Sequence, residues 1–250
     1  MKYAFWVVFC LINLSKLEAQ TTFIEQQMSF PKFKKAYNLR KDSLEKQYRR
    51  AHLDWPVKEI YIRSFKYDSQ LEVWGRNNHT EAFRLFKTYK ICALSGTIGP
   101  KRMDGDFQVP EGFYYVNEFR PNSNYHMALG INYPNSSDKL LSDSIKPGGD
   151  ILIHGFCVTQ GCIPIQNEQI EELYLLAAYA HASGQEFIPV HIFPIRFNNE
   201  KDLQFLKKSS KDEMEYQKFI SKMRLVFDYF EQNKKLPIIA VSSNGDYQIY

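Results

Sequence analysis

The pattern of apolar and polar positions changes twice along the chain. Residues 23–53 place aromatic and aliphatic side chains at helical spacing among many Lys, Arg and Glu residues, with a break near Pro31. This pattern predicts a helical segment that packs on one side. After this segment the apolar positions recur at every second residue. Ile60–Phe65 and Leu71–Trp74 alternate and are rich in β-branched and aromatic residues, so both stretches predict strands.

The β pattern continues through the middle of the chain. Residues 83–94, 127–132 and 187–197 mix apolar and polar positions in a way that predicts further strands. Ile151–Ile153 is a continuous apolar run, which favours a central strand buried on both faces. Residues 136–150 are rich in Ser, Asp and Gly and are expected to form a loop.

The end of the chain returns to helical periodicity. A helix is expected after Cys162, with Asn167 as its cap and Gly184 at its close. Residues 198–236 are charged and helical, and residues 236–250 resemble a final strand pair. The predicted fold class is α+β: a β-rich sandwich or partly closed barrel of mixed strands, with flanking N- and C-terminal helices.

The first nineteen residues have the layout of an export signal. Lys2 precedes the apolar stretch Tyr3–Leu14, and Ala19 supplies a small residue at the expected cut. The apolar part is too short for a comfortable transmembrane helix, although an uncleaved anchor is an alternative. We therefore expect residues 1–19 to be a signal peptide and the protein to be exported to the periplasm or cell envelope.

Composition narrows the function. The length of 250 residues fits one globular unit with a sizeable core. A net charge of +4 is mild, and no basic stripe interleaved with aromatic residues is present, so nucleic acid is not an expected partner. A slightly basic protein can still be drawn to an anionic polymer.

Three cysteines remain after removal of residues 1–19, namely Cys92, Cys157 and Cys162. In an oxidising compartment an odd number leaves at least one thiol unpaired or paired between chains. A Cys92–Cys157 disulfide would leave Cys162 free, whereas a Cys157–Cys162 disulfide would block it. The sequence does not decide between these pairings.

The stretch around Cys162 carries the candidate chemistry. The apolar run ends in His154-Gly155, and Gly161-Cys162 follows within eight residues. A thiol becomes a nucleophile when a base takes its proton, and His is the side chain suited to that task near neutral pH. Glycine lets a substrate carbonyl approach the backbone, whose N–H groups can hold an oxyanion. A buried structural His and an inert Cys are the simpler alternative.

These residues resemble a known family. The run from His154 to Cys162 is similar to the signature of the L,D-transpeptidase (YkuD-type) catalytic domain, most of all to its YafK-like branch. The segment Gly105-Asp106 to Pro110-Glu111-Gly112-Phe113-Tyr114 resembles a second, longer family motif. Gln160 and Pro164 stand where the wider family has His and Arg, so the resemblance does not define the substrate contacts.

The resemblance implies a function. It makes residues 20–57 an N-terminal helical segment, 58–198 the catalytic domain and 199–250 a helical and strand extension packed on that domain. The implied activity is cysteine acyl transfer on peptidoglycan stem peptides, cross-linking or exchanging them at the diamino acid residue. No cofactor and no metal are implied.

The resemblance also assigns roles to single residues. Cys162 would be the nucleophile and His154 the base, with backbone support from Gly155 and Gly161. The family also has a His that matches His126. Arg120, whose guanidinium can bind a carboxylate through two hydrogen bonds, and Thr159 are further residues expected to contact substrate or to orient the site. His126 as a structural hydrogen-bond partner, and Arg120 as a surface residue, are the simpler alternatives.

Three other functions stay open at this point. Water in place of the acceptor amine would make the protein a hydrolase that releases a wall-linked protein or trims stem peptides. A set of two His and two Cys, His126, His154, Cys157 and Cys162, offers zinc four ligands, although the spacing is unusual. A catalytically inactive wall-binding module is the remaining possibility.

Overall fold

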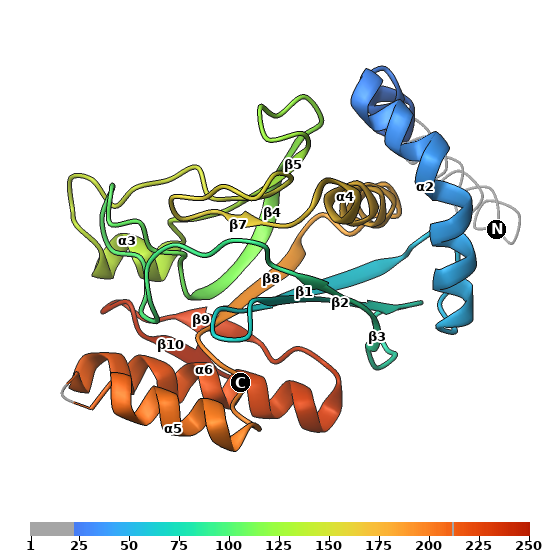
Figure 1. The fold of residues 1–250 in the computed structure, drawn as a ribbon. Helices are drawn as coiled ribbons and strands as arrows, with labels where there is room; N and C mark the ends of the chain where they lie inside the picture. The colour runs from blue at the N-terminus through green and yellow to red at the C-terminus, as the bar shows by residue number, and fades with distance from the viewer. Residues whose placement is uncertain (1–22, 212) are drawn as a thin grey trace, which may run out of the picture.

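The computed structural model describes residues 23–211 and 213–250, so the predicted signal peptide lies outside the described residues. An eight-stranded mixed sheet forms the centre of the fold (Figure 1). Its strands are β1 (Glu59–Phe65), β2 (Gln70–Arg76), β3 (Arg84–Lys90), β4 (Gly112–Arg120), β5 (Ala128–Ile131), β6 (Leu152–His154), β7 (Ile163–Pro164) and β8 (Ile188–Phe193). The predicted strands over 60–65 and 71–74 are confirmed as β1 and β2.

The strand order is β3-β2-β1-β8-β4-β5-β6-β7. Neighbours are antiparallel except for the pairs β1/β8 and β6/β7, which are parallel. The two edge strands approach each other at one end, because Ile91 after β3 forms a bridge with Ile165 after β7. Next to this bridge, Cys92 N donates to Pro164 O at 3.1 Å. The predicted partly closed barrel of mixed strands is therefore confirmed.

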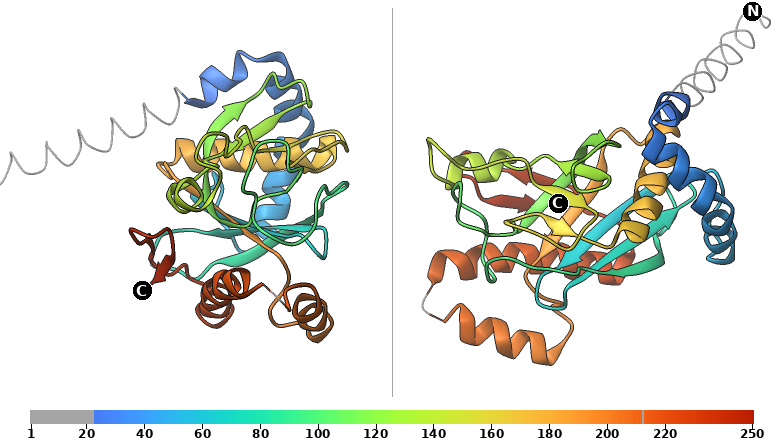
Figure 2. Two further views of the ribbon diagram at one scale, coloured as in Figure 1. Left: turned by 90° about the vertical axis from the view of Figure 1, so that its left-hand side faces the viewer. Right: turned by 45° about the horizontal axis from the view of Figure 1, so that its top comes forward.

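Helices cover both sides of the sheet (Figures 1 and 2). They are α2 (Pro31–Arg50), α3 (Ser136–Leu141), α4 (Asn167–Ala182), α5 (Glu200–Ser209) and α6 (Met214–Asn233). The larger apolar core joins the sheet to α2 and α4, and a second core joins it to α6 and to the hairpin of β9 (Ile239–Val241) and β10 (Tyr247–Ile249). Within the described ranges, no helix has the length and hydrophobicity needed to cross a membrane. The division of the chain at residues 57/58 and 198/199 stays a prediction.

Two predicted elements differ from the structure. The run Ile151–Ile153 was expected to be a central strand, but β6 lies next to the edge strand β7, and β8 and β4 occupy the two central positions. The expected loop 136–150 begins with helix α3. Asn135 and Asp138 stabilise its first turn reciprocally, since each side chain accepts a hydrogen bond from the other's backbone N–H.

Helix α4 also begins differently from the prediction. Its apolar face is buried as expected, and Gly184 follows its end with a φ of +101°. However, Gln166 occupies the cap position, and no side chain there hydrogen-bonds to the helix. The Asn167 side chain instead accepts a hydrogen bond from Phe156 N at 2.9 Å. The predicted cap is therefore wrong, and the helix lacks a side-chain N-cap, an interaction that commonly contributes about 1 kcal/mol to stability.

Candidate active site

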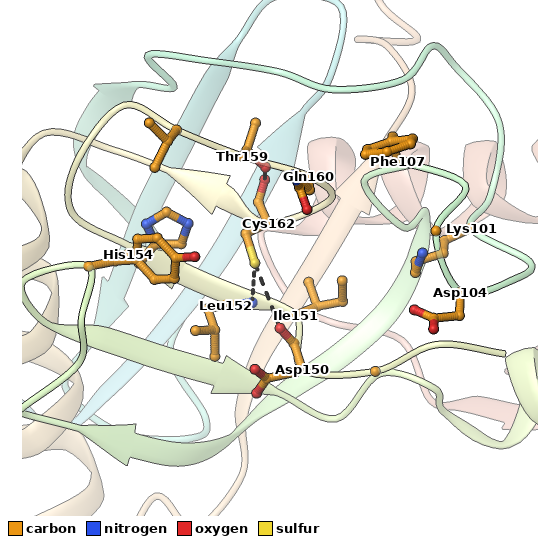
Figure 3. Close-up of a pocket in the computed structure, with 14 residues that line it drawn as sticks. Lys101, Asp104, Phe107, Asp150, Ile151, Leu152, His154, Thr159, Gln160 and Cys162 are labelled. Carbon is orange, nitrogen blue, oxygen red and sulfur yellow. Dashed lines mark hydrogen bonds between the residues drawn. The ribbon is translucent and has the colours of Figure 1, made fainter. Parts of the chain in front are cut away.

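A pocket of about 470 Å³ opens over β6 and the loop that leads into β7 (Figure 3). Three chain segments form most of its wall: the loop after residue 100, the residues that enter β6, and the loop between β6 and β7. Its lining includes both residues predicted to carry the chemistry, His154 and Cys162. The pocket is therefore the candidate active site.

Cys162 is the free thiol of the described chain. Its Sγ accepts a hydrogen bond from Leu152 N at 3.4 Å and donates one to Asp150 O at 3.7 Å. Burial raises the pKa of the thiol, and the backbone N–H of Leu152 opposes that shift. The sulfur is thus held in the pocket as a neutral thiol at neutral pH.

His154 ends strand β6 and is 1% exposed. Its Nδ1 lies 2.5 Å from Gly155 O. A carbonyl oxygen only accepts hydrogen bonds, so Nδ1 carries the proton and the neutral ring keeps its lone pair on Nε2. Burial lowers the pKa of the imidazole. The ring is therefore neutral near pH 7, in the tautomer that leaves Nε2 able to accept a proton.

The sheet register places these two side chains on one face. Ile153 pairs with Ile163 in the parallel β6/β7 ladder, and both are fully buried. Side chains alternate between faces along a strand, so the residues flanking this pair, His154 on β6 and Cys162 before β7, point to the opposite, pocket face. Figure 3 shows the imidazole and the sulfur on the same side of β6. In this state their hydrogen bonds go to backbone groups.

The two glycines predicted to support an oxyanion have other partners. Gly155 N donates to Met127 O at 3.2 Å, and Gly161 N donates to Thr159 Oγ1 at 3.1 Å. The Gly155 contribution is its carbonyl, which fixes the imidazole. Among the described residues the Cys162 N–H has no hydrogen-bond partner, so it is the amide left to hold an oxyanion.

Gly161 has a steric role as well. Its φ is +133°, and a Cβ built there would lie 2.9 Å from Gln108 O. A larger residue would strain the backbone and push the loop away from residue 108. Thr159 completes this turn, because its Oγ1 donates to Cys162 O at 2.7 Å while accepting from Gly161 N. Thr159 thus shapes the backbone that carries the thiol.

Neither of the other two predicted polar residues lines the pocket. His126 Nε2 pairs with Glu171 Oε1 of α4 at 2.9 Å, and the residue does not line the pocket, which agrees with its structural alternative. Arg120 pairs with Glu118 at 2.7 Å and with Asp150 at 2.6 Å. Arg120 therefore reaches the pocket wall only through Asp150.

The cysteine pairing is resolved by the structure. Cys92 and Cys157 form a disulfide and Cys162 is free, so the Cys157–Cys162 alternative is wrong. The four-ligand zinc set is not assembled either, because Cys157 is in the disulfide and His126 is paired with Glu171. No cluster of three metal-binding side chains occurs in the described part of the chain.

Several lining residues were not predicted from the sequence. The Tyr125 ring lies 4.6 Å from the His154 ring at a tilt of 32°, next to the His126 that was singled out. Lys101 lines the pocket with its charge already paired to Asp106 Oδ1 at 2.6 Å. The backbone carbonyl oxygen of Asp150 accepts a hydrogen bond from the Cys162 thiol. The sequence signal for Lys101 was its position in a loop rich in Gly and Pro. The sequence gave no signal that Tyr125 would line the pocket.

The geometry suits nucleophilic catalysis. A neutral thiol and a neutral imidazole with an unprotonated Nε2 line one pocket, and the backbone N–H of Cys162 has no hydrogen-bond partner among the described residues. In such a pair the imidazole removes the thiol proton as sulfur attacks an electrophilic carbon. The arrangement can therefore carry acyl transfer through a thioester.

Comparison with known proteins gives a consistent assignment. The model of the L,D-transpeptidase catalytic domain, YkuD, matches residues 64–192. The chain is 34% identical over 208 residues to YafK of Escherichia coli (strain K12), whose name assigns it provisionally to the L,D-transpeptidases, and the match covers 82% of this chain and 78% of YafK.

Solved structures give more distant matches. The helical cell shape determining protein Pgp2 from Campylobacter jejuni is 21% identical, with 80% of each chain covered and a TM-score of 0.42. Bd1075 from Bdellovibrio bacteriovorus is also 21% identical, with 70% of this chain and 63% of that chain covered and a TM-score of 0.39. On the family model and the identity to YafK, the chain belongs to the L,D-transpeptidase catalytic domain family.

Proposed function

We propose that the protein is a cysteine acyltransferase of the cell envelope that acts on peptidoglycan stem peptides. The observation that carries the proposal is that one pocket is lined by both a free thiol, Cys162, and an imidazole, His154, whose tautomer leaves Nε2 unprotonated. Membership of the L,D-transpeptidase family supports the substrate class. We propose the diamino acid residue of the stem peptide as the site of attack.

In the first half-reaction Cys162 Sγ attacks the carbonyl carbon of the scissile peptide bond. The thiol proton moves to His154 Nε2 as the S–C bond forms. The carbonyl oxygen becomes an oxyanion, which the Cys162 N–H is placed to hold. The C–N bond then breaks, and His154 returns the proton to the leaving amine. The products are an acyl-enzyme, in which the shortened stem peptide is held as a thioester on Cys162, and a released C-terminal fragment that carries the free amino group.

In the second half-reaction an amine of another stem peptide attacks the thioester. His154 Nε2 takes a proton from that amine, a new peptide bond forms, and the S–C bond breaks. The proton then returns to Cys162. One peptide bond is exchanged for another, so the reaction needs no external energy source or redox partner.

The proposal is tested by incubating the purified protein with muropeptides that carry tetrapeptide stems. Intact-mass measurement is expected to show an acyl adduct on Cys162, and chromatography is expected to show cross-linked or exchanged products. Cys162→Ala should abolish both. His154→Ala should slow adduct formation by ~10²–10⁴, the usual contribution of a general base.

A matched control is His181→Ala, since His181 of α4 packs against Phe23 and does not line the pocket. It should keep parental turnover. Products that are only shortened, with no exchange in the presence of excess acceptor, would replace the transferase assignment with hydrolysis. Parental turnover in Cys162→Ala would overturn the proposal.

A further inference from the structure

One peptide group beside the candidate site is bonded on both sides. The amide that joins Gly155 to Phe156 has a carbonyl that accepts from His154 Nδ1 at 2.5 Å. The N–H of that same amide donates to Asn167 Oδ1 at 2.9 Å. The chain of contacts therefore runs from the imidazole through one peptide group to the side chain of Asn167.

The Asn167 side chain hydrogen-bonds to the β6–β7 loop rather than to the start of its own helix. Asn167 is the first residue of α4, a position from which short polar side chains commonly serve the free N–H groups of the first turn. The start of α4 has no side-chain cap. The amide oxygen reaches back across eleven residues to Phe156 instead, so this Asn serves the β6–β7 loop.

The loop backbone needs such a contact. Phe156 has a φ of +60°, a left-handed conformation that is costly for a bulky residue and persists only where the surroundings enforce it. The Phe156 side chain is 47% exposed, so the core does not hold it. Asn167 also packs on Gly155, because a Cβ built there would lie 2.6 Å from Asn167 Oδ1.

We propose that Asn167 is a positioning residue for His154, acting through the Gly155–Phe156 peptide. This inference rests on the proposed function. A hydrogen bond accepted from the peptide N–H polarises the amide and strengthens its carbonyl as an acceptor. Asn167 thereby holds the carbonyl on Nδ1 and keeps the base lone pair on Nε2. The peptide and Asn167 together fill the place that a carboxylate takes in a Ser-His-Asp triad.

The test reads the imidazole directly. Selectively ¹⁵N-labelled histidine reports by NMR which ring nitrogen carries the proton, and His154→Gln assigns the His154 signals. In the parent the Nδ1–H tautomer should dominate. In Asn167→Ala a substantial fraction should shift to the Nε2–H tautomer, and turnover should fall ~10- to 100-fold, the scale seen when groups that orient functional imidazoles are removed, with little change in KM.

Asn167→Asp supplies a second readout. Its carboxylate can still accept from Phe156 N–H, so the Nδ1–H tautomer should persist. The added negative charge should stabilise the imidazolium and raise the pKa of His154. The acid limb of the pH–rate profile should then move to higher pH. The other titratable groups that line the pocket, namely Lys101, Asp104, Tyr125, Asp150 and Cys162, are unchanged in both variants.

Asn199→Ala is the matched control. Asn199 also stands at a helix start, where its Oδ1 accepts from Lys201 N and Asp202 N of α5, and it does not line the pocket. It should leave the His154 signals unchanged. The inference is overturned if Asn167→Ala keeps the parental tautomer, or, where that variant does not fold, if Asn167→Asp leaves the pKa of His154 unchanged. Because NMR needs no turnover, failure of the proposed function would be seen separately.

Discussion

Cys157 lies five residues before the free thiol Cys162 and is joined by a disulfide to Cys92, which follows β3. The loop between β6 and β7 is therefore tethered to the far edge of the sheet. The tether lies beside the Ile91–Ile165 bridge that brings the two sheet edges together. The same disulfide links the two sheet edges at this end of the partly closed barrel and tethers the loop that precedes Cys162.

Removal of this disulfide should affect both stability and activity. The bond joins residues 65 apart, and a disulfide over a loop of that size commonly contributes about 2–4 kcal/mol, mainly by restricting the unfolded chain. Cys92→Ser/Cys157→Ser should lower the free energy of unfolding by that amount in urea denaturation, and turnover should also fall. Cys162→Ala should keep parental stability. Equal stability of the double variant and the parent would show that the tether contributes nothing.

The thiol and the imidazole should behave as a neutral pair. Burial raises the pKa of Cys162 and lowers that of His154, so transfer of the proton from sulfur to nitrogen is unfavourable before substrate binds. Alkylation of Cys162 by iodoacetamide should therefore be slow at pH 6–7 and rise with an apparent pKa above the ordinary thiol value. A fast alkylation plateau below pH 7 would indicate a thiolate–imidazolium pair instead.

The pH dependence of turnover follows from the same shifts. His154 must be unprotonated to act as base, and its lowered pKa keeps it unprotonated to lower pH. The acid limb of kcat/KM should therefore lie below ~6.5, the ordinary imidazole value. Measurement from pH 4.5 to 8 in buffers of constant ionic strength checks this. An acid limb at or above the ordinary value would remove His154 as the base.

Thr159 should matter through its hydroxyl rather than its size. Its Oγ1 bonds both Gly161 N and Cys162 O, and each hydrogen bond contributes about 0.5–1.5 kcal/mol. Thr159→Val, which keeps the shape, should lower turnover about tenfold, because 1.4 kcal/mol in the barrier corresponds to that factor. Thr159→Ser keeps the hydroxyl and should retain most activity. Equal losses in both variants would point to packing instead.

The sequence predicted the features that depend on local pattern. The alternation in β1 and β2 and the apolar face of α4 lie within single elements, and both are confirmed. His154 and Cys162 were found because their residue types and spacing carry chemistry, and the structure brings them to one pocket. Their catalytic roles stay predictions.

The features that the sequence did not predict depend on contacts between distant segments. The strand order that places β6 near the edge arises from long-range pairing. Tyr125 reaches His154 only through the β5/β6 pairing that follows it. Asn167 matched a helix-cap pattern, but its side chain bonds a residue eleven positions earlier. Residue spacing alone cannot rank such a partner above the local one.

His191 provides a prediction about stability in acid. It is buried in β8, its Nδ1 lies 3.0 Å from Tyr61 Oη, and burial lowers its pKa to about 3. In the unfolded chain the pKa is ~6.5. Between these values the unfolded state binds a proton that the folded state does not, so stability falls as pH drops below 6.5, by ~1.4 kcal/mol per pH unit.

His191→Gln removes the titratable imidazole while keeping a polar partner for Tyr61. Between pH 6.5 and 5 the parent should therefore lose ~2 kcal/mol more stability than the variant. Urea denaturation at both pH values measures the difference. A uniform packing loss in the variant lowers its stability equally at the two pH values, so it does not imitate the effect. His154 contributes in the same direction but is present in both proteins. Parallel pH curves would mean that His191 titrates alike in the folded and unfolded states.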